Sequence, residues 1–470
     1  MKTVKRIKSK IGVEIKAGFW YTVGNFFLKG VSFITIPIFT RLLSTSDYGL
    51  VSLYMTWVSF FSIVVGLSLN SSVMRGYNDH KDDYDKYLSS TLFLSLLSFA
   101  VIVLLSTLFM NQLVTLTGFP FSIVLLILGQ SYLMFVINFN NMKYISQYMY
   151  KKYLLISIGN TLSGVFLSFF LIMVFQDDKY LGKIYGTFIP VFIIGTILFV
   201  SIYKKGKNLI NFKYWKYALV LSLPMIPHLV AHLILGQSDR IFIDKFVGSD
   251  YVGIYSFAYN IGLISHILLS SLNNAWVPWF YKKMDEKNYN KIVDKSRYYI
   301  LLLISFIIGL IYVSPEIVKI MAPIEYSEAI WIIPVIVMSY FFQFLYTILV
   351  NIQFYYKKNF FIPLGTVIAG LVNIGLNIYY IPLYGYAAAA YTTLASYVIL
   401  FLLHYIITRY FIKSDIYTFV FFIKPILLVI ILTSIFFFLT EEILIRYVML
   451  LFVFTIVLIK YRLKIIKFIK

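Results

Sequence analysis

Long apolar segments fill most of this chain, and they limit its fold more than any other feature. Several reach the roughly 20 residues that an α-helix needs to cross the hydrocarbon core of a bilayer. Hydrophobic residues make up 60% of the 470 residues, charged residues only 13%, and the mean hydropathy is +0.84. A soluble protein of this length has no interior that could bury so much apolar surface. The sequence therefore predicts an all-α integral membrane protein with about 14 transmembrane helices.

Short polar breaks separate the apolar segments, so no soluble domain is expected between them. The predicted helices span residues 17–41, 47–70, 88–111, 119–138, 153–176, 184–203, 217–244, 251–277, 299–319, 329–350, 360–380, 384–408, 422–440 and 445–460. The chain begins with the basic stretch MKTVKRIKSK, and no small-residue cleavage site follows a short apolar core. We therefore expect a cytoplasmic arm and a retained first helix. The absence of cysteine excludes disulfides and thiol-ligated metals.

The net charge of +21 follows the predicted membrane topology. With the N-terminus inside, the cytoplasmic arm, inner loops and C-terminal tail hold 32 of the 41 lysines and arginines. The outer loops and their edges hold only Arg41, Lys179, Lys183, Lys245, Lys319 and Arg446. This asymmetry is the positive-inside rule, and it predicts that both termini are cytoplasmic. The basic excess then reflects topology and attraction to membrane lipid head groups, so we expect no nucleic-acid partner.

Two polar motifs recur in the same order in both halves of the chain. FTRLLSTSDYGLVSLY (39–54) matches IDKFVGSDYVGIYSFAY (243–259), with an offset of 203 between the two SDY triplets, and QYMYKK (147–152) matches QFYYKK (353–358). Chance similarity between apolar segments is the alternative, but these matches keep their spacing and involve polar residues. The repeat spans six predicted helices, so both copies have the same orientation. Parallel repeats of this kind are typical of transporters that rock two lobes about a central site.

This repeat predicts two parallel six-helix lobes, helices 1–6 and 7–12, followed by two further helices. The expected organisation is a cytoplasmic basic arm (1–16), an N-lobe (17–203), a cytoplasmic basic linker (204–216), a C-lobe (217–408), and helices 13 and 14 with a basic cytoplasmic tail (409–470). Three roles stay open for helices 13 and 14: an added wall, a lipid-tail groove or an oligomer contact.

Four stretches carry a resemblance to a known family. They are TRLLSTSDYGLVSLY (40–54), GLSLNSSVMRGY (66–77), SDRIFIDKFVGSDYVGIYS (238–256) and NIGLNIYYIPLYGYAAAAYTTLASYVI (373–399). Together they resemble the polysaccharide-biosynthesis branch of the multidrug/oligosaccharidyl-lipid/polysaccharide (MOP) exporter superfamily, with its Wzx-like flippases of O-antigen and capsule repeat units. The resemblance covers essentially the whole chain.

The resemblance implies a flippase of the bacterial cytoplasmic membrane. Its expected cargo is a polyprenyl-diphosphate-linked oligosaccharide, carried from the inner to the outer leaflet by alternating access for O-antigen, capsule or similar polysaccharide assembly. Glycosyltransferases or a glycan polymerase are the expected protein partners. No cofactor is expected, although a proton or sodium gradient is a candidate energy source.

Ionisable residues within predicted membrane helices mark the candidate site. A charge at the bilayer centre costs about 2.5–3.5 kcal/mol on insertion scales, so it requires a reason. Lys29 lies twelve residues from either end of helix 1, and the repeat offset of 203 places His232 opposite it and His228 opposite Asn25. Each pair is spaced i, i+4 and shares one helix face. Facing a cavity between the lobes, these side chains would bind the diphosphate and glycan, and histidine charge can change near neutral pH.

Structural alternatives apply to the same residues. Lys29 could pair with a buried carboxylate on another helix. His228 and His232 could instead bond backbone carbonyls freed by Pro224 and Pro227. Two histidines at i, i+4 are also half of a zinc site, but the glutamate of an HExxH motif is missing, so we expect no metal.

Four further charged residues are candidates for the cavity mouths or for gating. Arg41 lies near the predicted outer mouth, where snorkelling is ordinary, and Arg75 lies among cytoplasmic charges near the inner one. The family resemblance strengthens the case for Arg75. Asp239 and Arg240 are adjacent and therefore point about 100° apart, so each could pair with another helix or take part in gating. Asp239 could also balance the cations or carry a coupling ion.

Prolines and asparagines are the last candidates for the transport site. Pro37 interrupts helix 1, and Pro224 and Pro227 interrupt helix 7, the equivalent helix of the second copy. Kinks there could flex during transport or be static. Asn273 and Asn274, near the cytoplasmic end of helix 8, are candidate cavity donors.

Other functions are less consistent with these residues. A membrane glycosyltransferase or polymerase needs carboxylates or a long outer loop, and the predicted outer loops are all short, so we expect no enzyme. An ion-coupled exporter of small cationic compounds with the same fold should carry acidic residues deep in helices 1–6. Only Lys29 is charged there, which favours an anionic cargo. A purely structural role leaves the intramembrane Lys, His and Asp unexplained.

Overall fold

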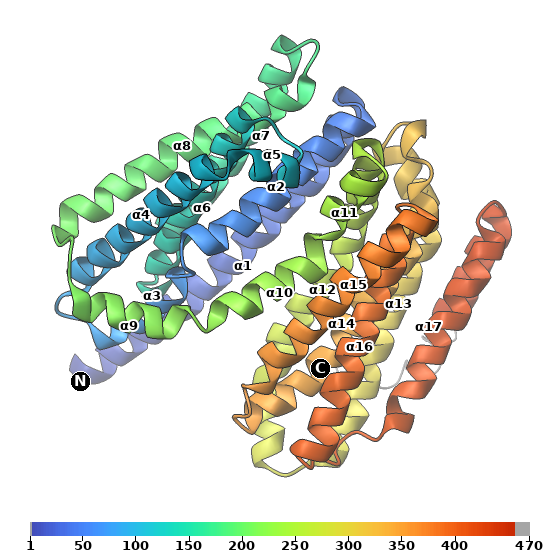
Figure 1. Ribbon diagram of the computed structural model, residues 1–470. Helices are drawn as coiled ribbons and strands as arrows, with labels where there is room; N and C mark the ends of the chain where they lie inside the picture. The colour runs from blue at the N-terminus through green and yellow to red at the C-terminus, as the bar shows by residue number, and fades with distance from the viewer. Residues whose placement is uncertain (1, 456–470) are drawn as a thin grey trace. The chain divides into compact units, whose positions relative to one another are not determined.

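The computed structural model describes residues 2–455, which contain helices and no β-strand (Figure 1). The helices are α1 (Lys2–Leu42), α2 (Thr45–Val65), α3 (Asn70–Asp79), α4 (Tyr84–Leu108), α5 (Met110–Thr117), α6 (Phe121–Ser146), α7 (Tyr150–Val174), α8 (Lys179–Gly206), α9 (Phe212–Ser222), α10 (Met225–Gln237), α11 (Asp239–Phe246), α12 (Ser249–Asp285), α13 (Tyr289–Met321), a 3₁₀ turn (Ile324–Tyr326), α14 (Ala329–Tyr355), α15 (Phe361–Tyr384), α16 (Ala388–Ile406), a π-helical turn (Ile407–Phe411), α17 (Phe419–Leu439) and a last helix (Ile443–Thr455).

Twelve of these helices are long and apolar enough to cross a membrane, and one bent pair brings the number to as many as 13 in the described residues. The all-α membrane fold is therefore confirmed. The fourteenth predicted helix, 445–460, is observed as Ile443–Thr455, and the remainder lies outside the described residues. The expected single helix 217–244 is wrong in detail. It is divided into α9, α10 and α11, and α9 and α10 meet at an angle of 42°.

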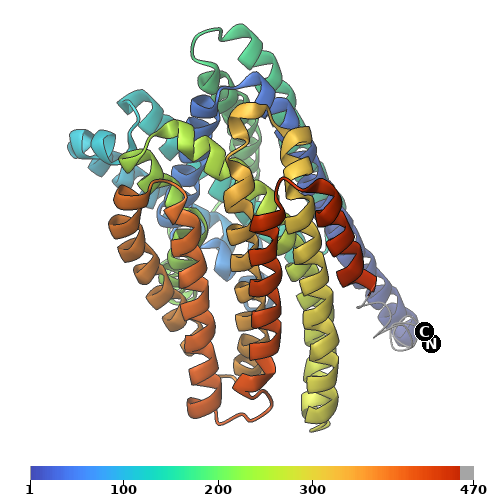
Figure 2. The same cartoon turned by 90° about the vertical axis from the view of Figure 1, so that its right-hand side faces the viewer.

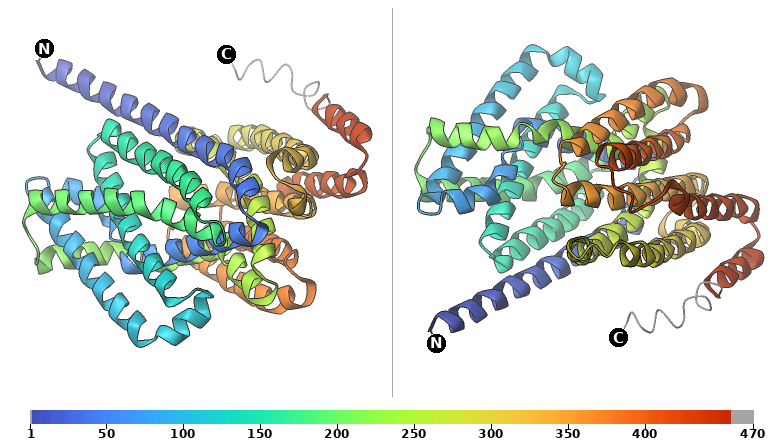
Figure 3. Two further views of the ribbon diagram at one scale, coloured as in Figure 1. Left: turned by 90° about the horizontal axis from the view of Figure 1, so that it is seen from above. Right: turned by 90° about the horizontal axis from the view of Figure 1, so that it is seen from below.

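The described chain divides into two compact units, Met1–Gly253 and Ile254–Lys470. The predicted lobes, with their boundary in the linker 204–216, stay a prediction. In the first unit, α2 packs along α6, and their buried side chains, among them Trp57 and Phe135, form the centre of an apolar core. The helices α7 and α8 form the most extensively packed pair. The N-terminal part of α1 projects beyond the rest of this unit (Figure 3).

The second unit is built around α14. Most of its side chains are buried, and it packs against α13, α16 and α17. In addition, α17 lies against α13, as Figure 2 shows. A helix that is apolar on all sides is expected at the centre of a bundle, where every face has a neighbour.

The start of α2 follows from the sequence STSD. The Ser44 side chain accepts a hydrogen bond from the Asp47 backbone nitrogen, and the Asp47 carboxylate accepts one from the Ser44 nitrogen. This reciprocal capping box satisfies two backbone donors that have no partner within the helix.

The two SDY motifs that identify the sequence repeat lie against each other where α2 and the first turn of α12 cross. The Thr45 hydroxyl donates to the Asp250 carboxylate over 2.6 Å. A Cβ atom on Gly49 would overlap the Ser249 carbonyl, and one on Gly253 would overlap the Thr45 carbonyl. Glycine at both positions therefore lets two helix backbones touch, which any larger residue would prevent.

Candidate functional site

A polar stripe runs along one flank of α1. Thr22, Asn25, Lys29 and Ser32 are spaced by three or four residues and so share one helix face. The buried face of α1, which includes Ala17 and Gly24, packs towards α7, where Gly24 lies against Leu154. Asn25 and Lys29 lie beside that face and are exposed. In a bilayer, an exposed stripe of this kind is stable only where it borders water or polar protein groups.

Within the described residues, Lys29 forms neither an ion pair nor a side-chain hydrogen bond. The alternative in which a buried carboxylate neutralises it therefore has no candidate partner there. Asn25 accepts a hydrogen bond of 2.9 Å from the hydroxyl of Tyr153 in α7, which fixes the amide beside Lys29. The arrangement presents an uncompensated ammonium next to an oriented amide.

The two histidines lie on α10, after the break at Pro224. His228 is half-buried and its Nδ1 has no hydrogen-bond partner in the described part of the chain, whereas His232 is exposed. The buried side chains Ala231 and Leu235 mark the packed face of α10, which contacts α2. His232 therefore occupies a flank of its helix, as Lys29 does on α1.

The prolines have different consequences in the two helices. Pro37 lies inside α1, which continues through it to Leu42. Pro224 precedes α10 and Pro227 lies in its first turn, so the chain bends before α10 begins. Proline is tolerated in a first turn because the nitrogen there has no helical acceptor.

Asp239 and Arg240 are both buried, in the first turn of α11. Arg240 Nη1 donates to the Gly236 carbonyl in α10 over 3.2 Å. This bond stabilises the break between α10 and α11, because carbonyls at a helix C-terminus lack partners within the helix.

The remaining predicted residues are Arg41, Arg75, Asn273 and Asn274. Arg41 Nη1 donates to the Pro37 carbonyl over 2.9 Å. Arg75 is exposed and pairs with Asp79 on the same helix at 3.4 Å. Asn273 accepts a bond of 2.9 Å from Asn351 in α14. Asn274, next to it, is exposed.

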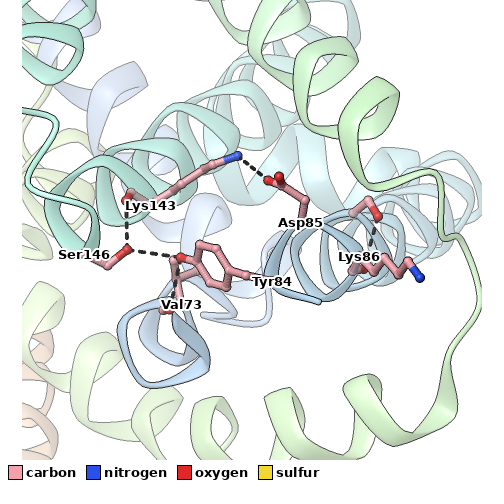
Figure 4. A network of polar contacts seen from close by, with 7 residues as sticks. Val73, Tyr84, Asp85, Lys86, Lys143 and Ser146 are labelled. Carbon is pink, nitrogen blue, oxygen red and sulfur yellow. Dashed lines mark hydrogen bonds and ion pairs between the residues drawn. The ribbon is translucent and has the colours of Figure 1, made fainter. Parts of the chain in front are cut away.

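The sequence reasoning missed an ion pair at the predicted cytoplasmic end of the first unit. Lys143 reaches from α6 to the Asp85 carboxylate in the first turn of α4, with 3.0 Å between Nζ and Oδ1 (Figure 4). The hydroxyl of Ser146 donates to the Lys143 carbonyl and lies 3.1 Å from the hydroxyl of Tyr84. The Lys143 side chain is only 8% exposed. The pair thus holds a buried ammonium in place, and its members are 58 residues apart, too far for sequence spacing to reveal.

An aromatic cluster attaches α9 to the same end. His80 stacks on Tyr87, and the rings of Tyr214 and Tyr217 contact it edge-on. The Tyr217 hydroxyl donates to Asp79 over 2.7 Å. These contacts fix α9 to α3 and α4, so the bend at Pro224 separates a fixed helix from α10.

Buried amides form another network in the second unit. Asn377 donates to Asn373 over 3.2 Å, Asn373 lies 3.4 Å from the hydroxyl of Thr393, and Thr392 donates to Asn377. These bonds join α15 to α16. In the described residues, no three His, Asp or Glu side chains converge to form a metal-binding group.

The fold is that of a known class of membrane transporters. The chain is similar in structure to the lipid II flippase MurJ in an inward closed conformation, with a TM-score of 0.73 and 18% identity over 94% of this chain and 98% of that one. It is also similar to an inward-facing multidrug resistance MATE family transporter of the MOP superfamily, with a TM-score of 0.65 and 13% identity over 83% and 96% of the two chains.

The sequence places the protein more closely. Residues 15–284 match the model of the polysaccharide biosynthesis protein family, and the chain belongs to that family. The Lsg locus protein 1 of Haemophilus influenzae is 26% identical over 379 residues, which cover 75% of this chain and 88% of that relative. An uncharacterized membrane protein of the same organism is 24% identical over 376 residues, or 77% and 89% of the two chains. The predicted membership of the polysaccharide-biosynthesis family is thereby confirmed, and the fold agrees with that of MOP superfamily transporters.

Proposed function

We propose that the protein flips a polyprenyl-diphosphate-linked oligosaccharide from the inner to the outer leaflet of the bacterial cytoplasmic membrane. Alternating access would move the head group, and the product would enter O-antigen, capsule or similar polysaccharide assembly. Membership of the polysaccharide biosynthesis family supports this direction. The family and fold are those of transporters and flippases, which supports transport without an enzymatic step.

The observation that carries the proposal is the sign of the charge on α1. Lys29 is exposed on a polar flank, has no anionic partner in the described residues, and is central in an apolar helix. Across the membrane helices of residues 12–206, Asp and Glu occur only near helix ends. A diphosphate would supply the counter-charge that the protein itself does not provide. An uncompensated ammonium gives little affinity for a cation, because like charges repel at short range.

His228 and His232 would add donors to the same head group from α10, and Asn25 would bind sugar hydroxyls or phosphate oxygens beside Lys29. Asp239 is the candidate carrier of a coupling proton or sodium ion. Glycosyltransferases or a glycan polymerase would act before and after the transport step. Both termini would lie in the cytoplasm, in agreement with the distribution of basic residues.

A second candidate is an ion-coupled exporter of small cationic compounds. Structural similarity to a multidrug resistance transporter keeps it open, because one fold can carry different cargoes. It would require acidic side chains at the depth of Lys29, and the sequence of α1, α2, α4, α6, α7 and α8 has none there.

The test is a flipping assay with the purified full chain in liposomes that carry a polyprenyl-diphosphate oligosaccharide in one leaflet. Wild type should move the lipid, and Lys29→Ala should reduce the rate about tenfold or more, the effect of losing one charged hydrogen bond. Lys29→Arg keeps the charge and should retain most activity. Lys151→Ala, which removes an exposed lysine at the start of α7, is the matched control.

One result would contradict the proposed site, and another would contradict the proposed function. Unchanged transport in Lys29→Ala would exclude Lys29 from the binding site but would not contradict the flippase function. Movement of cationic dyes, with no movement of any lipid-linked glycan, would replace the flippase with the exporter.

A further inference from the structure

A pocket in the second unit is lined by none of the residues of the proposed transport site. It has a volume of about 340 Å³, and helix ends surround it: the last turn of α13, the first of α14, the end of α17 and the start of the last helix. This volume falls within the range of small-molecule sites, roughly 300–1,000 Å³. Its lining residues include Lys319, Glu328, Trp331, Glu441 and Arg446. The charge pattern predicts that this end of the unit faces outward, and we refer to the cavity as the outer pocket.

Arg446 is the most informative of these residues. It is 1% exposed, and one of its terminal nitrogens forms an ion pair with Glu316 of α13. Its Nε and Nη1 are buried without an acceptor among the described residues. Glu316 Oε2 is likewise buried there without a donor. A guanidinium is always charged, and an unsatisfied buried donor costs about 1–3 kcal/mol, more when it is charged. The pocket beside it is where an acceptor can enter.

The predicted topology strengthens this argument. Only six of the 41 lysines and arginines fall in predicted outer segments or at their edges, and two of these six, Lys319 and Arg446, line this one cavity. Basic residues are scarce on the outer side of bacterial membrane proteins, so two in one pocket call for a specific ligand.

The pocket also contains negative charge. Glu441 and Glu328 line it, and Glu328 accepts a bond of 2.7 Å from the Tyr386 hydroxyl. Two carboxylates disfavour a purely anionic ligand, because they repel it while Arg446 and Lys319 attract it. Besides the Arg446–Glu316 pair, one cation and two anions line the pocket, and both signs together suit a ligand that also carries both.

The surroundings of the pocket resemble a membrane boundary. Trp331 lies on its wall with 48% of its surface exposed, and tryptophan is enriched where hydrocarbon meets head groups. Large apolar side chains are exposed at the same helix ends, namely Ile320, Ile324, Phe438 and Leu444. Acyl chains could cover these side chains while a head group occupies the pocket.

We propose that the outer pocket binds a membrane phospholipid whose head group combines a phosphate with a primary ammonium, as ethanolamine lipids do. The phosphate accepts hydrogen bonds from the free donors of Arg446 and from Lys319. The ammonium donates to Glu441 and Glu328. A bound lipid would then connect α13, α14, α17 and the last helix at one end of the bundle.

Native mass spectrometry of the full chain, delipidated in detergent, tests this proposal. The probes are phospholipids with identical acyl chains and ethanolamine, glycerol or choline head groups, together with polyprenyl diphosphate. Wild type should bind the ethanolamine lipid at least about fivefold more strongly than the glycerol lipid, because the glycerol head group lacks one charged hydrogen bond. Choline keeps the positive charge of ethanolamine but donates no hydrogen bond, and it should bind with intermediate strength.

Variants at exposed positions keep the test independent of folding. Lys319→Gln should weaken binding of the ethanolamine lipid about fivefold or more, and Glu441→Gln should abolish the preference over the glycerol lipid. Lys245→Gln, which removes an exposed lysine far away in the sequence, should change neither. Equal binding by wild type and Lys319→Gln would overturn the proposal. Preferential binding of the glycerol lipid or of polyprenyl diphosphate would overturn it as well. Neither result depends on transport activity.

Discussion

Two added methyl groups should be enough to open the contact between α2 and the first turn of α12. In the double variant Gly49→Ala/Gly253→Ala, the Cβ on residue 49 would lie 2.9 Å from the backbone nitrogen of residue 253 and would overlap the Ser249 carbonyl. Comfortable contacts begin near 3.5 Å, so the backbones must separate by at least about half an ångström. Backbone atoms of two helices cannot rotate away as a flexible side chain can.

The magnitude follows from two opposing terms. Overpacking costs about 1–3 kcal/mol per site. Alanine returns about 0.5–1 kcal/mol per site, because glycine in a helix is entropically costly. At the centre of these ranges, the double variant should therefore destabilise the contact by about 2.5 kcal/mol net. The hydrogen bond between Thr45 and Asp250 would lengthen at the same time.

The natural chain contains no cysteine, so a cross-linking assay has no background. Thr45→Cys and Asp250→Cys place two thiols where two hydrogen-bonded side chains now meet, and a short bifunctional reagent should join them rapidly. Adding the glycine double variant should slow this reaction at least about fivefold, the population change that 1 kcal/mol produces.

The matched control is Gly30→Ala/Gly159→Ala, since a Cβ at either position meets no atom within 4 Å. Its cross-linking rate should equal that of the parent pair. If the double variant at the contact also reacts at the parent rate, the two backbones do not approach closely and the reasoning fails.

Three further predictions concern the first unit. Asp85→Asn should lower the stability of the protein by about 1–2 kcal/mol because it leaves the Lys143 ammonium buried without a counter-charge, and adding Lys143→Met should restore most of the loss in thermal unfolding in detergent. If Asp85→Asn unfolds at the wild-type temperature, the pair contributes nothing. Pro224→Ala should straighten the 42° bend between α9 and α10, measurable as a longer spin-label distance across it, whereas an unchanged distance would assign the bend to packing. Tyr153→Phe should release the Asn25 amide and slow flipping about threefold to tenfold without changing thermal stability, and a normal rate would exclude a role for its orientation.

The positions of the helices could be predicted because their cause is local. Each apolar run is set by bilayer thickness, and a motif such as STSD marks a helix start by its own hydrogen bonds. The breaks within the helices were harder to predict from the sequence. The predicted helix 47–70 divides into α2 and α3 at Leu67 and Ser68, which adopt positive φ values of 47° and 50°. Non-glycine residues rarely adopt this conformation, so no residue preference signals it.

The sequence also led to the polar face of α1, because a lysine in the middle of an apolar helix is visible without coordinates. The pairing of charges was not visible. Lys143 with Asp85, and Arg446 with Glu316, join residues 58 and 130 positions apart, and only packing brings them together. The roles of Asn25, Lys29, His228 and His232 in transport stay a prediction.

The states of three intramembrane or buried cations suggest what each of them is for. A structural charge needs a permanent partner, and Lys143 has one at 3.0 Å. A transport site has the opposite requirement: if the protein neutralised its own charge, an arriving anion would have to displace that partner and would gain little. Lys29 meets this requirement, since the described chain provides no counter-charge for it. Arg446 is intermediate, with one nitrogen paired and two free, as expected for a site that keeps its ligand instead of passing it on. Substituting the three residues in turn should therefore affect three different properties: folding for Lys143, transport for Lys29 and lipid retention for Arg446.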